Sequence, residues 1–127
     1  MLIKEYFQEI ADIINNHPAV QSASVEYDKR SGHIGFIRGS LWFFNKSVLH
    51  FREYADVQND IVLYMYAYQY QNAENIMIFR YDNTPHFPSL HTFPHHKHDG
   101  SESNVISAIQ PNLTSVLYEI QQILISE

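Results

Sequence analysis

The sequence contains no cysteine. A disulfide framework and a cysteine-ligated zinc site are therefore excluded, and nothing points to an oxidising compartment. Long apolar runs are also missing, and an acidic residue, Glu5, occurs near the start, so neither a secretion signal nor a membrane span is indicated. We expect a cytoplasmic protein with no membrane partner.

Basic residues are scarce. Lysine and arginine together number 8, against 14 aspartate and glutamate residues, which gives a formal net charge of −6 with neutral histidines. This balance argues against a protein that binds nucleic acid through a broad basic surface. The 8 histidines weaken the argument, because their protonation would reverse the sign of the charge. The local field of a site can therefore differ from that of the whole chain.

Several catalytic motifs are absent. The sequence has no glycine-rich phosphate loop, no Gly-x-Ser-x-Gly elbow, no His-Glu-x-x-His pair and no cysteine nucleophile. Its acidic residues are scattered through expected turns and helix surfaces, which disfavours a hydrolase with paired carboxylates. The remaining candidates for chemistry are histidine, arginine and tyrosine.

A chain of 127 residues suffices for a single α+β domain, 1–127, and is too short for two ordinary ones. Apolar residues at helical spacing predict one helix over roughly residues 2–16 and another after Pro111. Between them lie five segments rich in aromatic and β-branched residues: 21–29, 33–43, 47–57, 61–71 and 75–82. Because the linkers are short, we predict a five-stranded antiparallel meander flanked by an N-terminal and a C-terminal helix.

Alternation assigns side chains to the two faces of the sheet. In the third segment an apolar set alternates with a polar one, which consists of His50, Arg52, Tyr54 and Asp56. The polar set resembles the surface of a functional site, although Arg52 and Arg80 could instead pair with nearby carboxylates in an ordinary surface network. Glu53 falls on the apolar face. Since a buried carboxylate without a partner is costly, we expect a bulge there or an arginine that reaches it.

The fourth segment places tyrosine at positions 64, 66, 68 and 70, and we expect all four side chains to share one side. Tyrosine favours strands and can bury its ring while its hydroxyl stays wet. A half-buried sheet face is therefore favoured over a platform for substrate.

Five of the eight histidines fall within residues 83–98, a stretch punctuated by Pro85, Pro88 and Pro94. Histidine can act as acid, base or metal ligand near neutral pH, so a cluster in a stiff loop is a candidate site. A solvated loop without function is the alternative. The place of this loop relative to Arg52 and Arg80 decides between the two.

A metal site is one candidate chemistry for the loop. It offers four imidazoles for zinc: His91, His95, His96 and His98. Asp82 or Asp99 would add an oxygen ligand. The spacing predicts no particular geometry, because the prolines disfavour a helical pairing of ligands.

Metal-independent cleavage of RNA is the leading hypothesis, with no cofactor. Cleavage through the 2′-hydroxyl needs a base, a cation for the phosphate and an acid for the departing oxygen. Arginine suits the phosphate, histidine suits either proton transfer, and aromatic residues can stack unpaired bases. The candidate catalytic residues are His50, Arg52, Tyr66, Tyr68, Arg80, Asp82, His95 and His98. The candidate substrate-binding residues are Tyr54, His86, His96 and Lys97.

Six motifs in order span most of the chain: VEYDKRS (25–31), GFIRG (35–39), LHFREY (49–54), YAYQYQ (66–71), FRYDN (79–83) and FPHHKH (93–98). Together they resemble the TumE-like family, small proteins that are toxin components of toxin–antitoxin systems. The resemblance implies a toxin encoded beside a DNA-binding antitoxin. It brings no established catalytic residues, so the roles above rest on residue chemistry alone.

Two other functions stay open. One is a non-enzymatic module whose tyrosine face or histidine loop binds a protein partner, most plausibly the cognate antitoxin. The other is a zinc- or nickel-dependent hydrolase built on the histidine loop. The expected partners are the antitoxin and, under the leading hypothesis, single-stranded RNA, and a homo-oligomer stays open.

Overall fold

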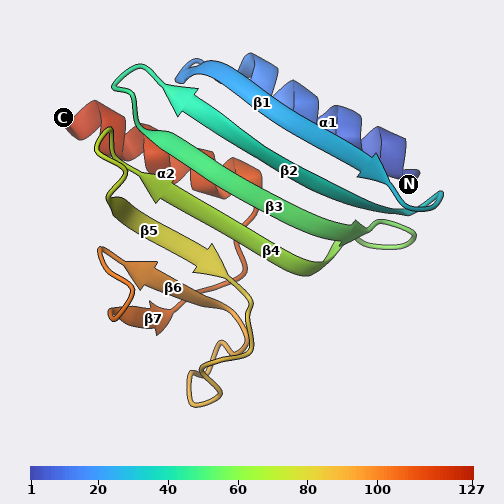
Figure 1. The fold of residues 1–127 in the computed structure, drawn as a ribbon. Coiled ribbons are helices and arrows are strands. Elements are labelled where there is room, and N and C mark those ends of the chain that lie inside the picture. The colour runs from blue at the N-terminus through green and yellow to red at the C-terminus, as the bar shows by residue number, and fades with distance from the viewer.

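The computed structural model describes all residues, 1–127, which form two helices and seven strands (Figure 1). The helices are α1 (Ile3–Asn16) and α2 (Leu113–Ser126). The strands are β1 (Val20–Lys29), β2 (Ile34–Phe43), β3 (Val48–Asp56), β4 (Val62–Gln71), β5 (Met77–Asp82), β6 (His96–Asp99) and β7 (Val105–Ser107). At 14 residues each, both helices are too short to span the core of a bilayer.

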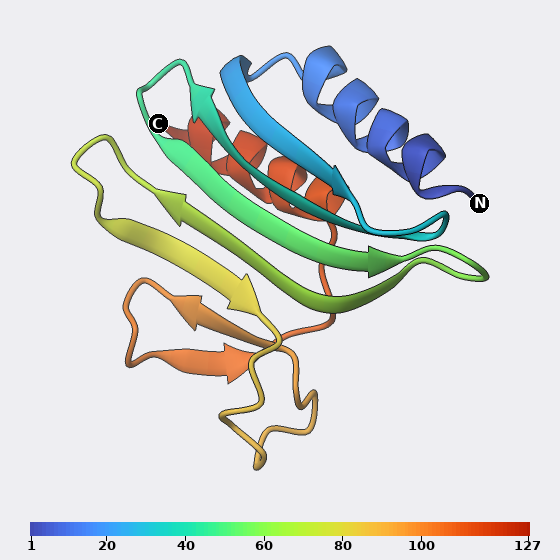
Figure 2. The same cartoon turned by 45° about the vertical axis from the view of Figure 1, so that its right-hand side comes forward.

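All seven strands form one antiparallel sheet in which neighbours in the sequence are also neighbours in space. Helices α1 and α2 lie on the same face of this sheet, and the second face carries no helix (Figure 2). We call the second face the open face. The predicted fold, an antiparallel meander flanked by an N-terminal and a C-terminal helix, is confirmed.

The meander is longer than the predicted five strands, because β6 and β7 extend it. Strand β6 consists of His96, Lys97, His98 and Asp99, which carry little intrinsic preference for a strand. Its conformation is supplied by pairing with β5, in which Arg80 lies opposite His98 and Asp82 opposite His96. Part of the histidine-rich segment is therefore an integral part of the sheet.

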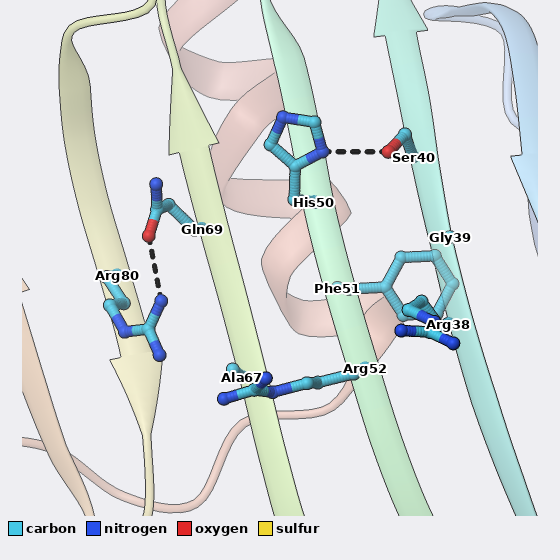
Figure 3. A pocket seen from close by; sticks show the side chains of 9 residues that line it. All are labelled: Arg38, Gly39, Ser40, His50, Phe51, Arg52, Ala67, Gln69 and Arg80. Atoms are coloured by element: carbon cyan, nitrogen blue, oxygen red, sulfur yellow. Dashed lines mark hydrogen bonds between the residues drawn. The ribbon is translucent and has the colours of Figure 1, made fainter.

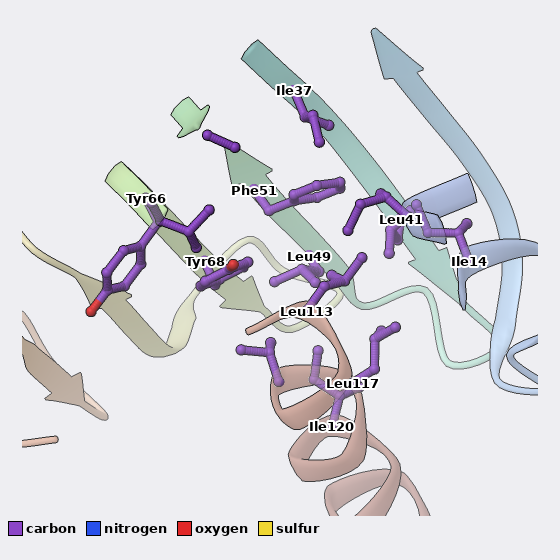
Figure 4. Close-up of a cluster of buried hydrophobic side chains, with 14 of the residues drawn as sticks. Ile14, Ile37, Leu41, Leu49, Phe51, Tyr66, Tyr68, Leu113, Leu117 and Ile120 are labelled. Carbon is purple, nitrogen blue, oxygen red and sulfur yellow. The ribbon is translucent and has the colours of Figure 1, made fainter. Parts of the chain in front are cut away.

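The hydrophobic core lies between the helices and the covered face of the sheet (Figure 4). The fully buried members that β2, β3 and α2 contribute include Ile37, Leu41, Leu49, Leu113, Leu117 and Ile120. Burying a side chain of this size contributes roughly 1.5–3 kcal/mol relative to exposing it. Helix α1 ends at Asn16 and is followed by its C-cap, His17, and by Pro18. Helix α2 begins after Asn112, whose side chain accepts a hydrogen bond from the amide of Ser115.

Glu53 is fully buried on the covered face. The expectation that the strand is bulged there or that an arginine reaches the carboxylate is wrong. The strand is not bulged at this position, and no arginine reaches the carboxylate. Instead, the hydroxyl groups of Tyr6 and Tyr68 donate hydrogen bonds to its two oxygens. Burial nevertheless raises the pKa of the Glu53 carboxyl, although both hydrogen bonds oppose this shift.

The tyrosines of β4 do not all share one side, as was expected. Tyr66, Tyr68 and Tyr70 are buried on the covered face, but a bulge interrupts the pairing of β3 with β4 beside Tyr64. The extra residue reverses the alternation, so Tyr64 lies on the open face. There its hydroxyl donates a hydrogen bond to Asp56, and its ring meets that of Tyr54 edge to face.

Candidate functional site

Two neighbouring rows of side chains cross the open face from one edge of the sheet to the other. The strand register defines the first row as Glu26, Arg38, Arg52, Ala67, Asp82, His96 and Ser107. It defines the second row as Ser24, Ser40, His50, Gln69, Arg80, His98 and Val105. Chemically active side chains from five different strands are thus held side by side by backbone pairing.

Arg38 and Arg52 are directly opposite each other on β2 and β3. The nearest carboxylate to Arg38 is that of Glu26, at 3.9 Å and highly exposed. Arg52 makes no ion pair within the protein. Like charges directly opposite in a sheet are destabilising, so the pair makes no stabilising contact of its own.

A shallow hollow of about 290 Å³ lies over this part of the sheet (Figure 3). Arg38, His50, Arg52 and Arg80 contribute its charged or titratable lining. In Figure 3 the side chain of Arg52 extends across β4, above Ala67, because the small alanine side chain leaves space there. The hollow therefore presents guanidinium groups to any anion that enters it.

His50 occupies the same hollow and is held by one hydrogen bond. Its Nδ1 lies 2.7 Å from the hydroxyl oxygen of Ser40, the residue opposite it on β2. The other ring nitrogen, Nε2, has no hydrogen-bond partner within the protein. An exposed imidazole that is oriented through one nitrogen and free at the other is suited to accept or donate a proton.

Arg80 and Asp82 form the next part of the open face. The Arg80 Nε donates to Asp82 Oδ2 at 2.8 Å, and its Nη1 donates to Gln69 at 2.8 Å. The expectation of a carboxylate partner is thus met for Arg80, whereas Arg52 has none. Burial disfavours ionisation of Asp82, but hydrogen bonds from Arg80 and Thr84 outweigh it and lower the pKa of the carboxyl.

His96 and His98 point at Asp82 from β6. The Nε2 of His96 lies 3.0 Å from Oδ1, and the Nε2 of His98 lies 3.7 Å from Oδ2. All three side chains are buried. A second cavity of about 350 Å³ adjoins them, and His86 and Phe87 help to line it.

The remaining candidate residues line neither the hollow nor the cavity beside Asp82. Tyr54 is on the open face, beside Tyr64. Tyr66 and Tyr68 belong to the core, and burial raises the pKa of both. His95 bonds through Nδ1 to the hydroxyl of Tyr66, 2.8 Å away, and burial lowers its pKa. Neither tyrosine, nor His95, is brought to the Arg52 position.

Lys97 also points away from the open face, toward α2. Its ammonium group donates a hydrogen bond of 2.8 Å to Glu119 and lies over the rings of Phe79 and Tyr81. Burial, with a hydrogen bond to Glu119, raises the pKa of Tyr81 to about 12. These contacts hold α2 against the sheet and give Lys97 no access to a substrate on the other side.

The four imidazoles considered for zinc do not converge. His91 is exposed, with Nδ1 3.4 Å from the hydroxyl of Ser107, and His95 contacts Tyr66. Only His96 and His98 come together, and Asp82 completes a group whose ligand atoms lie within 4.8 Å of one another.

Sequence reasoning missed Arg38, Ser40 and Gln69 as lining residues of the hollow. The signal for the first two was present, because Arg38 and Ser40 alternate with the apolar Ile37 and Leu41. Only the register of β2 against β3, however, puts Arg38 opposite Arg52 and Ser40 opposite His50.

These observations define a small α+β protein whose uncovered sheet face carries arginine and histidine. The chain belongs to the TumE toxin family, since the family model described as Toxin TumE matches residues 10–124. The match extends from α1 to α2, includes every residue of the two rows, and confirms the resemblance seen in the sequence. No curated protein and no solved structure matches the chain.

Proposed function

We propose that this toxin binds single-stranded RNA on the open face and cleaves its phosphodiester backbone. The observation that carries the proposal is the direct opposition of Arg38 and Arg52 without an intervening carboxylate. Each guanidinium group can donate to phosphate oxygens of a bound strand, with Arg38 at β2 and Arg52 reaching across β4 (Figure 3). A neighbouring antitoxin is the expected protein partner, given the family.

His50 is the proposed base for the 2′-hydroxyl proton. It lies next to Arg52 along β3 and lines the same hollow, and its Nε2 is free. In this arrangement the imidazole removes the proton as the 2′ oxygen attacks phosphorus. The bond from phosphorus to the 5′ oxygen breaks, which leaves a 2′,3′-cyclic phosphate, and a solvent water protonates the departing 5′ oxygen. Arg38 and Arg52 stabilise the charge that builds up on the phosphate. This step needs no metal ion, because side chains supply both the base and the cation.

The aromatic pair on the open face supports a single-stranded substrate. Tyr54 and Tyr64 meet edge to face with ring centroids 5.7 Å apart, and Tyr64 is largely exposed. Unpaired bases stack on such rings without strong dependence on sequence, at about 1–3 kcal/mol per base. Tyr54 is two residues from Arg52 on the same side of β3, so one strand of RNA can contact both.

The test is cleavage of a labelled single-stranded RNA by the wild type and three variants. We expect His50→Ala to slow cleavage by about 10²- to 10⁴-fold with little change in RNA affinity. We expect Arg52→Gln to weaken binding and cleavage together, and Arg30→Gln, which alters an exposed arginine paired with Asp28, to change neither.

An RNA with 2′-deoxy sugars is the matched substrate control. It lacks the attacking hydroxyl, so the proposed route predicts that it is bound and left intact. Cleavage of the 2′-deoxy substrate at the normal rate would rule out this route, and full activity of both His50→Ala and Arg52→Gln would rule out the site.

A protein-binding module without catalysis is the second candidate. Apolar side chains gather where the β2–β3 turn meets the end of α2, and Phe44 and Ile125 there are 66% and 68% exposed. Such a patch fits a protein partner, here the antitoxin. Co-expression with the genomic neighbour tests this reading: a stable complex that Phe44→Asp disrupts, formed by a chain that neither cleaves RNA nor inhibits growth, would favour it over the enzyme.

A further inference from the structure

The group formed by Asp82, His96 and His98 has a feature that the proposed RNA cleavage does not use. Each imidazole faces an oxygen through both of its ring nitrogens. The Nδ1 atoms lie 3.1 Å from the carbonyl oxygen of Pro94 and 2.9 Å from that of Glu102. The Nε2 atoms both point at the carboxylate of Asp82.

A neutral imidazole cannot satisfy this arrangement, because it carries only one N–H. A backbone carbonyl only accepts hydrogen bonds, so each Nδ1 carries the proton. The lone pair of each Nε2 then faces the carboxylate oxygens of Asp82, which is repulsive. A cation bound between the two Nε2 atoms and the carboxylate would turn this repulsion into coordination.

A divalent cation bound here would meet both Nε2 lone pairs and the carboxylate of Asp82 at one point. Such close pairing is needed in a buried place, because removing charges from water is costly unless they are well paired. Two neutral imidazoles that share one cation with a carboxylate remove the repulsion and leave every Nδ1 hydrogen bond in place.

We propose that Asp82, His96 and His98 bind a divalent transition-metal ion of the zinc class. Ligand atoms at 2.0–2.2 Å in a tetrahedral site are roughly 3.4 Å apart. The Nε2 of His96 lies 3.0 Å from Oδ1 and that of His98 3.7 Å from Oδ2, and one ligand atom from each of the three residues lies within 4.8 Å of the others, so small side-chain shifts would bring them to that separation. Two imidazoles with one carboxylate form a common ligand set for such ions.

The surroundings of the three side chains match those of metal ligands. Imidazole ligands are usually oriented by a hydrogen bond from the second ring nitrogen to a carbonyl or carboxylate, as both rings are here. The carboxylate is oriented by Arg80 and by the amide of Thr84, which donates to Oδ1 at 3.0 Å. Phe87 covers the rings of His96 and His98 and limits the access of water.

The three side chains line the adjoining cavity. That cavity is also lined by His86 and by Glu102, and it shares Arg80 with the hollow over Arg52. A water molecule or an oxygen of a substrate can therefore complete the coordination. The inference stands apart from the proposed RNA cleavage, because ion binding is measured directly and needs no substrate.

The experiment uses untagged full-length protein, freed of metal with a chelator and then titrated with Zn²⁺ in a calorimeter. We expect one ion per chain and a raised melting temperature. A parallel titration with Co²⁺ should give the visible absorption of a low-coordinate nitrogen and oxygen site. The variants His98→Asn and Asp82→Asn should each weaken binding by more than about 100-fold, beyond the effect of losing an outer contact.

The other histidines of the segment supply the matched control. His91→Asn combined with His95→Asn removes two exposed or partly buried imidazoles outside the cluster and should leave affinity and stoichiometry unchanged. The proposal is overturned if the wild type binds no ion, if His98→Asn binds as tightly as the wild type, or if the control variant is the one that loses binding. Circular dichroism of metal-free His98→Asn tests whether its fold is retained, and Asp82→Asn provides an independent second test.

Discussion

Arg38 and Arg52 are directly opposite each other on adjacent strands, with no carboxylate between them. The other arginines that make close contacts do so with carboxylates: Arg30 with Asp28, and Arg80 with Asp82. Like charges at directly opposite positions of neighbouring strands lower the stability of the fold. An anion that binds both groups offsets this cost. Removing one of the two arginines should therefore raise the stability of the free protein and weaken its binding of anions.

That inverse relation gives the first prediction. Replacing Arg52 with glutamine should raise the free energy of unfolding by about 0.2–1 kcal/mol, because the repulsion with Arg38 is lost. The same variant should bind single-stranded RNA about 10-fold more weakly, since one charged hydrogen-bonding group to phosphate is removed. Urea unfolding and RNA titration at one salt concentration measure the two effects. A variant that loses stability and keeps its affinity would show that Arg52 has a structural role.

Salt dependence provides the second prediction. Each phosphate contact on a single strand contributes about 0.7 to the slope of log affinity against log salt concentration. Arg52→Gln should therefore lower the magnitude of the slope by roughly 0.7, and Arg30→Gln should leave it unchanged. Equal slopes for the wild type and Arg52→Gln would mean that Arg52 contacts no phosphate.

The buried Glu53 predicts a specific dependence of stability on pH. Burial raises the pKa of its carboxyl in the folded chain, so the folded state holds the proton to higher pH than the unfolded state does. The contribution of Glu53 to stability is then largest below the ordinary glutamate pKa and falls as the pH rises through the raised value. Glu53→Gln cannot ionise and should lack this fall. Thermal unfolding at several pH values compares the two proteins, and parallel curves would contradict the prediction.

Lys97 supplies a prediction about the covered face. Replacing it with methionine should lower the free energy of unfolding by about 1–3 kcal/mol, because the hydrogen bond to Glu119 is lost between buried or half-buried groups. RNA binding should not change, since Lys97 points toward α2. Lys4→Met, at an exposed position of α1, is the control for loss of a lysine charge and should have little effect on stability. If Lys97→Met lost RNA affinity and Lys4→Met did not, the prediction would be wrong and Lys97 would be a substrate-binding residue.

The sequence predicted the architecture well, for reasons visible in particular residues. Alternation across Leu49, His50, Phe51 and Arg52 identified both faces of β3, because each strand of the centre has one covered side and one uncovered side. The place of Tyr64 could not be predicted in the same way, because one extra residue in β4 reverses the alternation and leaves no mark in the composition.

The candidate site was predicted in part. Arg52, His50, Arg80, Asp82 and His98 were all identified, and the structure brings them to the open face. The convergence of His96 and His98 on Asp82 could not be derived, because it follows from the register of β6 on β5. A run of histidine and lysine carries no periodic apolar signal, so its pairing depends on the rest of the fold.

The connection between β5 and β6 distinguishes the two halves of the open face. Strands β2 and β3 are joined by the turn 44–47, whereas β5 and β6 enclose the much longer segment 83–95. Closing a longer loop costs more entropy, and β7, the last strand, has only three residues to secure that edge. Transient detachment of the β6–β7 hairpin would therefore separate His96 and His98 from Asp82, while Arg38 and Arg52 stay in register on β2 and β3. The cluster around Asp82 and the arginine pair can thus form and open independently of each other.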